Sequence, residues 1–174
     1  MELENKISYN LSIEKVVYDE ENKFPGKKFD FTLTLKNSDG SAYTDTVSTP
    51  SGATDWSGTG GVYSFKLGSR ESVTLTLPIA VRYSVNEAYT EGFQTDWQVT
   101  YTEAGTVKTD KEKTNTVTER PLLSDHSVVY YNLTQEELPA AGGFGIPFPA
   151  LVGATSLFAL LLTWYYKRRW VIDR

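Results

Sequence analysis

The chain has 174 residues, no cysteine, one histidine and a formal net charge of −5. Its last eight residues hold four basic residues and one acidic residue, so the preceding 166 residues carry a net charge of −8. Such an acidic body argues against nucleic acid as a partner and against docking on anionic lipid. Without cysteine, the chain cannot use the disulfides that often stabilise secreted domains.

Residues 1–8 form a polar N-terminal lead. They contain neither the basic region nor the apolar region of a signal peptide, although the C-terminal features described below require export. Three explanations stay open. The chain is a fragment or a trimmed version, its start is misassigned, or its C-terminal helix inserts into the membrane on its own.

Alternation of apolar and polar residues dominates residues 11–133 and predicts β-strands. Residues 41–61 are rich in Ser, Thr and Gly and are expected to form a long loop, and residues 103–120 are expected to form weaker strands or an exposed hairpin. No stretch before residue 134 has a helical period. These features predict an all-β fold, an antiparallel immunoglobulin-like β-sandwich over residues 9–134. The expected strands surround six apolar runs: Phe29–Leu35, Tyr63–Leu67, Val73–Leu77, Val81–Val85, Trp97–Tyr101 and Val128–Leu133.

Three polar residues fall on expected apolar faces of three different strands. Successive side chains of a strand point to opposite faces. Lys15 therefore shares a face with Leu11, Ile13 and Val17, and Glu87 shares a face with Val81, Tyr83 and Val85. By the same alternation, Asn132 shares a face with Val128 and Tyr130.

Burial of this trio favours a neutral lysine amine and a protonated glutamate, because burial lowers the pKa of Lys and raises that of Glu. A neutral amine is a nucleophile. A protonated carboxyl can hydrogen-bond the Asn carboxamide oxygen and polarise its carbon. Attack would form an amide between Lys15 and Asn132 and release ammonia in a single turnover. In the alternative interpretation, Lys15 extends its amine to solvent from a strand edge, and Glu87 and Asn132 are ordinary strand-end residues.

The body resembles the isopeptide-forming pilin domains of Gram-positive surface proteins, which are related in form to collagen-adhesin B-type modules. The resemblance covers roughly residues 9–134. In that family, a Lys of the first strand bonds an Asn of the last strand with the help of a Glu. The resemblance therefore implies a Lys15–Asn132 isopeptide bond with Glu87 in the catalytic role. Its carriers are Leu11–Val17, Phe29–Leu35, Ser72–Pro78, Tyr83–Glu87, Gly92-Phe93 and Val128–Asn132.

Residues 135–174 are organised as a sorting signal. Residues 135–145 form a linker that holds a short motif, residues 146–166 are apolar and uncharged, and residues 167–174 form a basic tail. About 20 apolar residues suffice for a helix to cross a bilayer core of roughly 30 Å, and a following basic cluster marks the cytoplasmic side. Residues 146–166 are therefore expected to form a transmembrane helix, which ends at the membrane stop Lys167, Arg168 and Arg169.

The motif resembles the LPXTG signal that sortases cleave before the glycine. It consists of Leu138, Pro139, Ala140, Ala141 and Gly142. Ala141 stands where the family has Thr, but acyl transfer uses the backbone carbonyl, which Ala also supplies. If no sortase accepts the motif, the product is a single-pass membrane protein.

Other polar features carry weaker signals. His126 is expected in a solvated turn, and Asp19-Glu20-Glu21 lacks the spacing of a calcium loop. Trp56, Trp97 and Tyr43 are expected to pack in the core and loops rather than to mark a ligand surface. No cofactor, no metal site and no independent enzyme is predicted.

The sequence therefore predicts a structural protein of the Gram-positive cell surface, a minor pilin or a wall-anchored module. Its expected partners are sortase, peptidoglycan or other pilin subunits, and the membrane through residues 146–166. The rival hypothesis is an adhesin whose loop 41–61 or residues 103–120 contact a host ligand.

Overall fold

The computed structural model describes residues 7–18, 24–50 and 52–134, which all lie in the unit Met1–Glu136. Within these residues the chain forms ten strands and no helix. The strands are β1 (Ser8–Tyr18), β2 (Lys28–Lys36), β3 (Thr54–Thr59), β4 (Val62–Gly68), β5 (Ser72–Pro78), β6 (Arg82–Glu87), β7 (Phe93–Glu103), β8 (Thr106–Glu112), β9 (Thr116–Pro121) and β10 (His126–Thr134).

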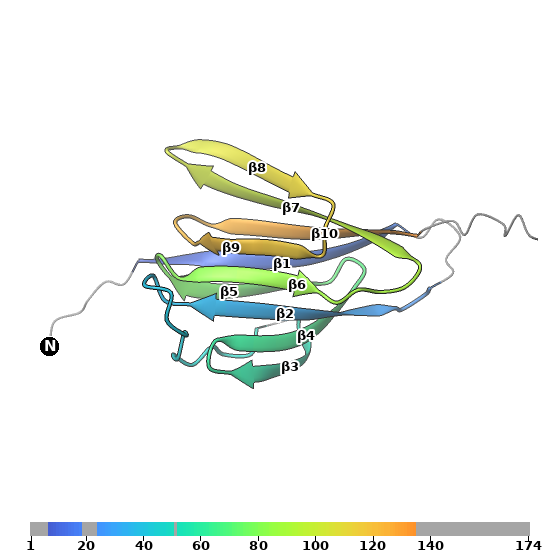
Figure 1. The fold of residues 1–174 in the computed structure, drawn as a ribbon, viewed down its shortest axis with the longest axis horizontal. Helices are drawn as coiled ribbons and strands as arrows, with labels where there is room; N and C mark the ends of the chain where they lie inside the picture. The colour runs from blue at the N-terminus through green and yellow to red at the C-terminus, as the bar shows by residue number, and fades with distance from the viewer. Residues whose placement is uncertain (1–6, 19–23, 51, 135–174) are drawn as a thin grey trace, which may run out of the picture. The chain divides into compact units, whose positions relative to one another are not determined.

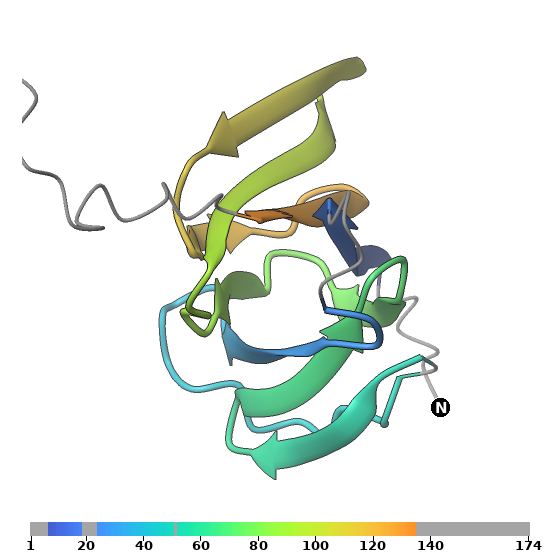
Figure 2. The same ribbon diagram turned by 90° about the vertical axis from the view of Figure 1, so that its right-hand side faces the viewer.

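The strands form two five-stranded sheets that pack face to face (Figures 1 and 2). The first sheet has the order β5-β1-β10-β7-β8 and the second has the order β3-β4-β2-β6-β9. The prediction of an all-β sandwich is confirmed. The inward positions of both sheets alternate with outward polar ones, so the two inner faces close one shared core. That core includes Leu11, Ile13, Phe31, Leu33, Phe65, Val85, Trp97 and Tyr130.

One strand pair departs from the antiparallel prediction. β1 and β10, the first and last strands, lie side by side and run parallel, with Lys15 opposite Tyr130 and Val17 opposite Asn132. Both strands end on the same side in Figure 1. Alternation has the same period in parallel and antiparallel strands, so the sequence pattern alone carried no sign of this orientation.

The expected loop over residues 41–61 is wrong in its last part, because β3 pairs with β4 there. Its signal was weak for two reasons. Only Trp56 is a large apolar residue in β3, and the strand is irregular, with positive φ at Asp55 and Gly58. A register shift between Thr54 and Ser57 interrupts the pairing, as a β-bulge does.

Residues 103–120 contain two strands that join different sheets. β8 forms an antiparallel hairpin with β7, turning at Ala104-Gly105, where both residues have positive φ. β8 is largely exposed, as the prediction of an exposed hairpin expected. β9 crosses to the second sheet and pairs with β6.

Several expectations fall outside the described residues. These are the lead 1–6, the acidic run 19–21, the motif 138–142, the apolar segment 146–166 and the basic cluster 167–169. In the part of the chain that the structure describes, no helix is long and apolar enough to cross a membrane.

Candidate functional site: a buried Lys-Glu-Asn cluster

Lys15, Glu87 and Asn132 come together inside the sandwich from three strands. β1 carries Lys15 and its neighbour β10 carries Asn132, so the pairing of these strands brings the two residues to the same inner face. Glu87 ends β6 in the opposite sheet, where it lies opposite Phe31 of β2. Each residue continues the inward alternation of its own strand, and for that reason each points into the core.

The carboxylate of Glu87 bridges the other two side chains. Lys15 Nζ donates a hydrogen bond to Glu87 Oε2 at 2.6 Å, and Asn132 Nδ2 donates one to Glu87 Oε1 at 2.5 Å. All three residues have a relative exposure of 0%. A lysine and a carboxylate with no access to water are rare in folded domains, so this cluster requires an explanation beyond packing.

The surroundings of the lysine amine are aromatic. Lys15 Nζ lies 4.5 Å from the ring centroid of Phe29 and 5.9 Å from that of Phe31. Phe31 in turn packs edge-on against Tyr130 with ring centroids 5.2 Å apart. These rings exclude water from the amine, which hydrogen-bonds the Glu87 carboxylate.

Asn132 is only half satisfied. Its Nδ2 donates to Glu87, but its buried Oδ1 has no hydrogen-bond partner among the described residues. A buried acceptor without a donor costs about 1–3 kcal/mol. Rotation of the carboxamide by half a turn would place Oδ1 on Glu87, and a protonated carboxyl could then donate to it.

Both titratable groups are shifted toward their neutral forms. Burial lowers the pKa of Lys15 to about 8, against the opposing attraction and hydrogen bond of Glu87. Burial likewise raises the pKa of Glu87, against the opposing effects of Lys15 and the Asn132 hydrogen bond. The low-dielectric interior therefore shifts the pair toward a free amine beside a protonated carboxyl. That pair supplies a nucleophile and a proton donor next to a carboxamide carbon.

The sequence places Tyr130 on the inward face with Asn132 but does not predict a role for its hydroxyl. Its hydroxyl donates to the Val85 carbonyl at 2.7 Å and accepts from the Val117 amide at 3.3 Å. These bonds fasten β10 to β6 and β9 of the other sheet, which holds Asn132 and Glu87 at a fixed separation. The inward alternation of β10 marked Tyr130 as buried, but its partners are 45 and 13 residues away in sequence.

The expected solvated turn at His126 is wrong. His126 starts β10, is 6% exposed, and its Nδ1 lies 2.8 Å from the Tyr83 hydroxyl. Burial lowers its pKa to about 4, and the Arg120 charge acts in the same direction. A lone histidine after a Ser-Asp pair is typical of a turn. Its hydrogen-bond partner, Tyr83, is 43 residues away, so the local sequence gives no sign of the contact.

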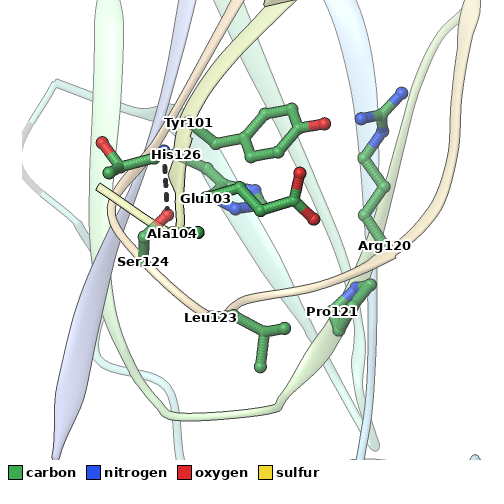
Figure 3. A pocket seen from close by; sticks show the side chains of 9 residues that line it. Tyr101, Glu103, Ala104, Arg120, Pro121, Leu123, Ser124 and His126 are labelled. Carbon is green, nitrogen blue, oxygen red and sulfur yellow. Dashed lines mark hydrogen bonds between the residues drawn. The ribbon is translucent and has the colours of Figure 1, made fainter. Parts of the chain in front are cut away.

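His126 also lines a cavity of about 360 Å³ between the β7–β8 turn and the segment before β10. Figure 3 shows the side chains of Tyr101, Glu103 and Leu123 around this cavity, where the Thr102 amide donates to Ser124 Oγ. The cavity is separate from the lysine cluster, because no residue of the cluster lines it.

Burial decides one other expectation. Trp97 and Tyr43 are buried and Trp56 packs against the core, so the prediction that these aromatic residues serve packing is confirmed. No group of three or more His, Cys, Asp or Glu residues that could hold a metal ion occurs among the described residues.

Comparison with known proteins identifies one family and several structural relatives. The family described as "Domain of unknown function (DUF7601)" matches residues 9–120. No curated protein matches the chain.

The structural relatives are pilus proteins. A major pilin of Streptococcus pyogenes, T3.2, has a TM-score of 0.55 at 24% identity, over 74% of this chain and 45% of that chain. A variant of the major pilin from Streptococcus pyogenes has a TM-score of 0.52 at 22% identity, over 73% and 48%. The pilus-presented adhesin Spy0125 (Cpa) has a TM-score of 0.58 at 24% identity, over 75% and 28%. The chain thus spans less than half of each pilin chain and less than a third of the adhesin. At these identities the likeness establishes a shared fold.

Proposed function

This chain belongs to the family of Domain of unknown function (DUF7601), and from its pilin-like fold and its buried cluster we propose that it is a structural module of the Gram-positive cell surface. In this proposal an amide between Lys15 and Asn132 ties the first strand to the last. The observation that carries the proposal is the fully buried Glu87 carboxyl, which contacts both side chains within 2.6 Å.

The reaction balances with the groups present. The neutral amine of Lys15 attacks Cγ of Asn132, while protonated Glu87 hydrogen-bonds Oδ1 and draws electron density from the carbon. The tetrahedral intermediate transfers the amine proton through Glu87 to the departing nitrogen, which leaves as ammonia. One C–N bond forms, one C–N bond breaks, and Glu87 ends with the proton it began with. The apolar surroundings favour the reaction because burial shifts the pKa of Lys15 and that of Glu87 toward the uncharged forms.

The location of the bond fits a protein that carries tension. β1 and β10 are neighbours and run parallel. In the proposed arrangement, force applied before β1 and after β10 would pass through the Lys15–Asn132 amide and bypass the more than one hundred residues between them.

The attachment to the surface belongs to the same proposal. Leu138, Pro139, Ala140, Ala141 and Gly142 would be the sortase signal, residues 146–166 would hold the chain in the membrane before cleavage, and Lys167–Arg169 would stop its transfer. Cleavage after Ala141 would pass the chain to peptidoglycan or to another pilin subunit. These assignments depend on the order of the motif, the apolar segment and the basic cluster.

The intact masses of the wild type and two variants test the proposed bond. Wild-type protein should be lighter than its sequence by one ammonia, and Lys15→Ala should have its full sequence mass. Lys28→Ala is the matched control, because Lys28 pairs with Glu71 at the surface. It should still lose ammonia. Full mass in folded wild-type protein would refute the proposal.

An adhesin is the second candidate, and the cavity beside His126 is the observation that favours it. Its apolar lining and the Glu103 carboxylate at its side could accept part of a host ligand. Binding to a host-ligand array that Leu123→Asp abolishes would favour the adhesin. Cross-linked multimers in wall extracts, without such binding, would favour the pilin.

A further inference from the structure

The outer face of the first sheet carries a strip of apolar and aromatic side chains at the ends of β1 and β10. We call it the aromatic strip. It comprises Val16, Tyr18, Val129, Tyr131 and Leu133. Tyr18 and Leu133 are 53% and 41% exposed, and the other three residues are partly buried. Contiguous exposed apolar surface with a polar rim marks an interaction site more often than scattered apolar residues do.

The parallel pairing of the two strands brings the members of this strip side by side. Val16 lies opposite Tyr131, and Tyr18 lies opposite Leu133. The rings of Tyr18 and Tyr131 are stacked with centroids 6.1 Å apart and planes only 16° from parallel. The strip is distinct from the lysine cluster, since Lys15 points into the core and its neighbour Val16 points outward.

Amides and carboxylates flank the strip on the same face. Asp96 of β7 lies opposite Tyr131, Gln94 lies opposite Leu133, and Gln98 lies opposite Val129. Gln94 Nε2 donates to Asp96 Oδ1 at 3.2 Å, so the two side chains are oriented together. On the other side of β10, Glu14 lies opposite Val129.

These flanks select the chemistry of the partner. Two carboxylates beside the strip oppose an anionic polymer such as a polyphosphate, and the net charge of −8 before residue 167 opposes it further. Hydroxyl and amide N–H groups of a neutral partner can instead donate to Asp96 and Glu14, and its carbonyl groups can accept from the glutamine amides.

We infer that the aromatic strip binds a neutral glycan strand, the amino-sugar backbone of peptidoglycan. The C–H face of a pyranose is apolar and weakly positive, which complements the negative face of a tyrosine ring. Its equatorial hydroxyls and N-acetyl groups point sideways, toward the polar flanks. The half-exposed ring of Tyr18, packed on Tyr131, offers such an aromatic surface to a sugar.

The choice of wall glycan rests on the proposed function. β10 ends at Thr134, and the proposed attachment residue Ala141 follows seven residues later. Seven residues span at most about 25 Å. Attachment at Ala141 would therefore hold Thr134, which follows Leu133 of the strip, within about 25 Å of the wall peptide. A short tether of this kind gives an effective concentration on the order of millimolar, at which weak sugar binding is sufficient.

The test uses the full chain, kept in mild detergent. The soluble probe is an oligomer of β-1,4-linked N-acetylglucosamine, and the insoluble probe is purified wall glycan. Calorimetry and co-sedimentation should show binding by the wild type. Tyr18→Ala and Tyr131→Ala should each weaken it at least about tenfold, the effect of losing about 1.4 kcal/mol of stacking. Tyr89→Ala is the matched control, because Tyr89 is a 77% exposed tyrosine of the β6–β7 loop. It should bind like the wild type.

Several results would overturn the inference. These are no glycan binding by the wild type, equal weakening by Tyr89→Ala, tighter binding to a polyphosphate, or a strip that instead drives self-association. Intact mass of the same sample separates this failure from failure of the proposed function. Ammonia loss without glycan binding would overturn the glycan inference alone. Glycan binding without ammonia loss would refute the cross-link and leave the sugar site standing.

Discussion

Loss of Lys15 should change how the domain responds to force. In the wild type, an amide from Lys15 to Asn132 would leave the 116 residues between them outside the path of tension. In Lys15→Ala those residues join that path. At roughly 3.4 Å per residue, their unfolding should add about 400 Å of contour length.

Single-molecule pulling between handles placed before β1 and after β10 measures this length directly. The wild type should extend without a domain-unfolding step, and Lys15→Ala should show one step of about 400 Å. Asn132→Ala gives a second route to the same result if Lys15→Ala folds poorly, because it keeps the Lys15–Glu87 ion pair. A step of the same length in wild-type protein would refute the covalent path through these two residues.

Three further predictions follow from individual contacts. Glu87→Ala should abolish ammonia loss, while Glu71→Ala, which removes the surface partner of Lys28, should leave ammonia loss unchanged. Intact mass after refolding distinguishes these two outcomes. Full cross-linking of Glu87→Ala would show that the Glu87 carboxyl is dispensable. Phe29→Ala should admit water to the Lys15 amine and slow cross-linking, with a loss of about 3–5 kcal/mol in the free energy of unfolding. Phe29→Leu should keep most of the cross-linking rate. Equal cross-linking rates for the two variants, followed by mass over time, would count against the role of burial. Burial lowers the folded-state pKa of His126 to about 4, below its unfolded value of about 6.5. As pH falls, the unfolded chain therefore binds the proton first. The free energy of unfolding should decrease by at most about 3 kcal/mol between about pH 6.5 and pH 4. His126→Gln should flatten that pH dependence in urea titrations, and parallel profiles for the two proteins would contradict it.

The candidate site was visible in the sequence because a strand alternates strictly between two faces. Lys15, Glu87 and Asn132 each occupy an inward position of a strong strand, and a charged residue at such a position stands out against apolar neighbours. Alternation does not predict which strands lie next to one another. The adjacency of β1 and β10 and the approach of β6 depend on contacts between residues far apart in the chain.

The errors have related physical causes. β1 and β10 run parallel, but a strand has the same period in either orientation. The sequence of β3 predicts a loop because this irregular strand has few apolar positions to alternate. The sequence predicts an exposed His126 because it gives no sign of the hydrogen-bond partner, Tyr83, which lies on a strand of the other sheet. The aromatic strip was missed because Tyr18 and Tyr131 become neighbours only when the first and last strands pair.

The most direct measurement of the central claim is tandem mass spectrometry of peptides from the folded, digested chain. The Lys15–Asn132 bond predicts one branched peptide, in which the Lys15 amine is acylated by the Asn132 side chain and the mass is one ammonia below the sum of the two peptides. Recovery of both peptides unlinked, in full yield and from protein shown to be folded, would contradict it.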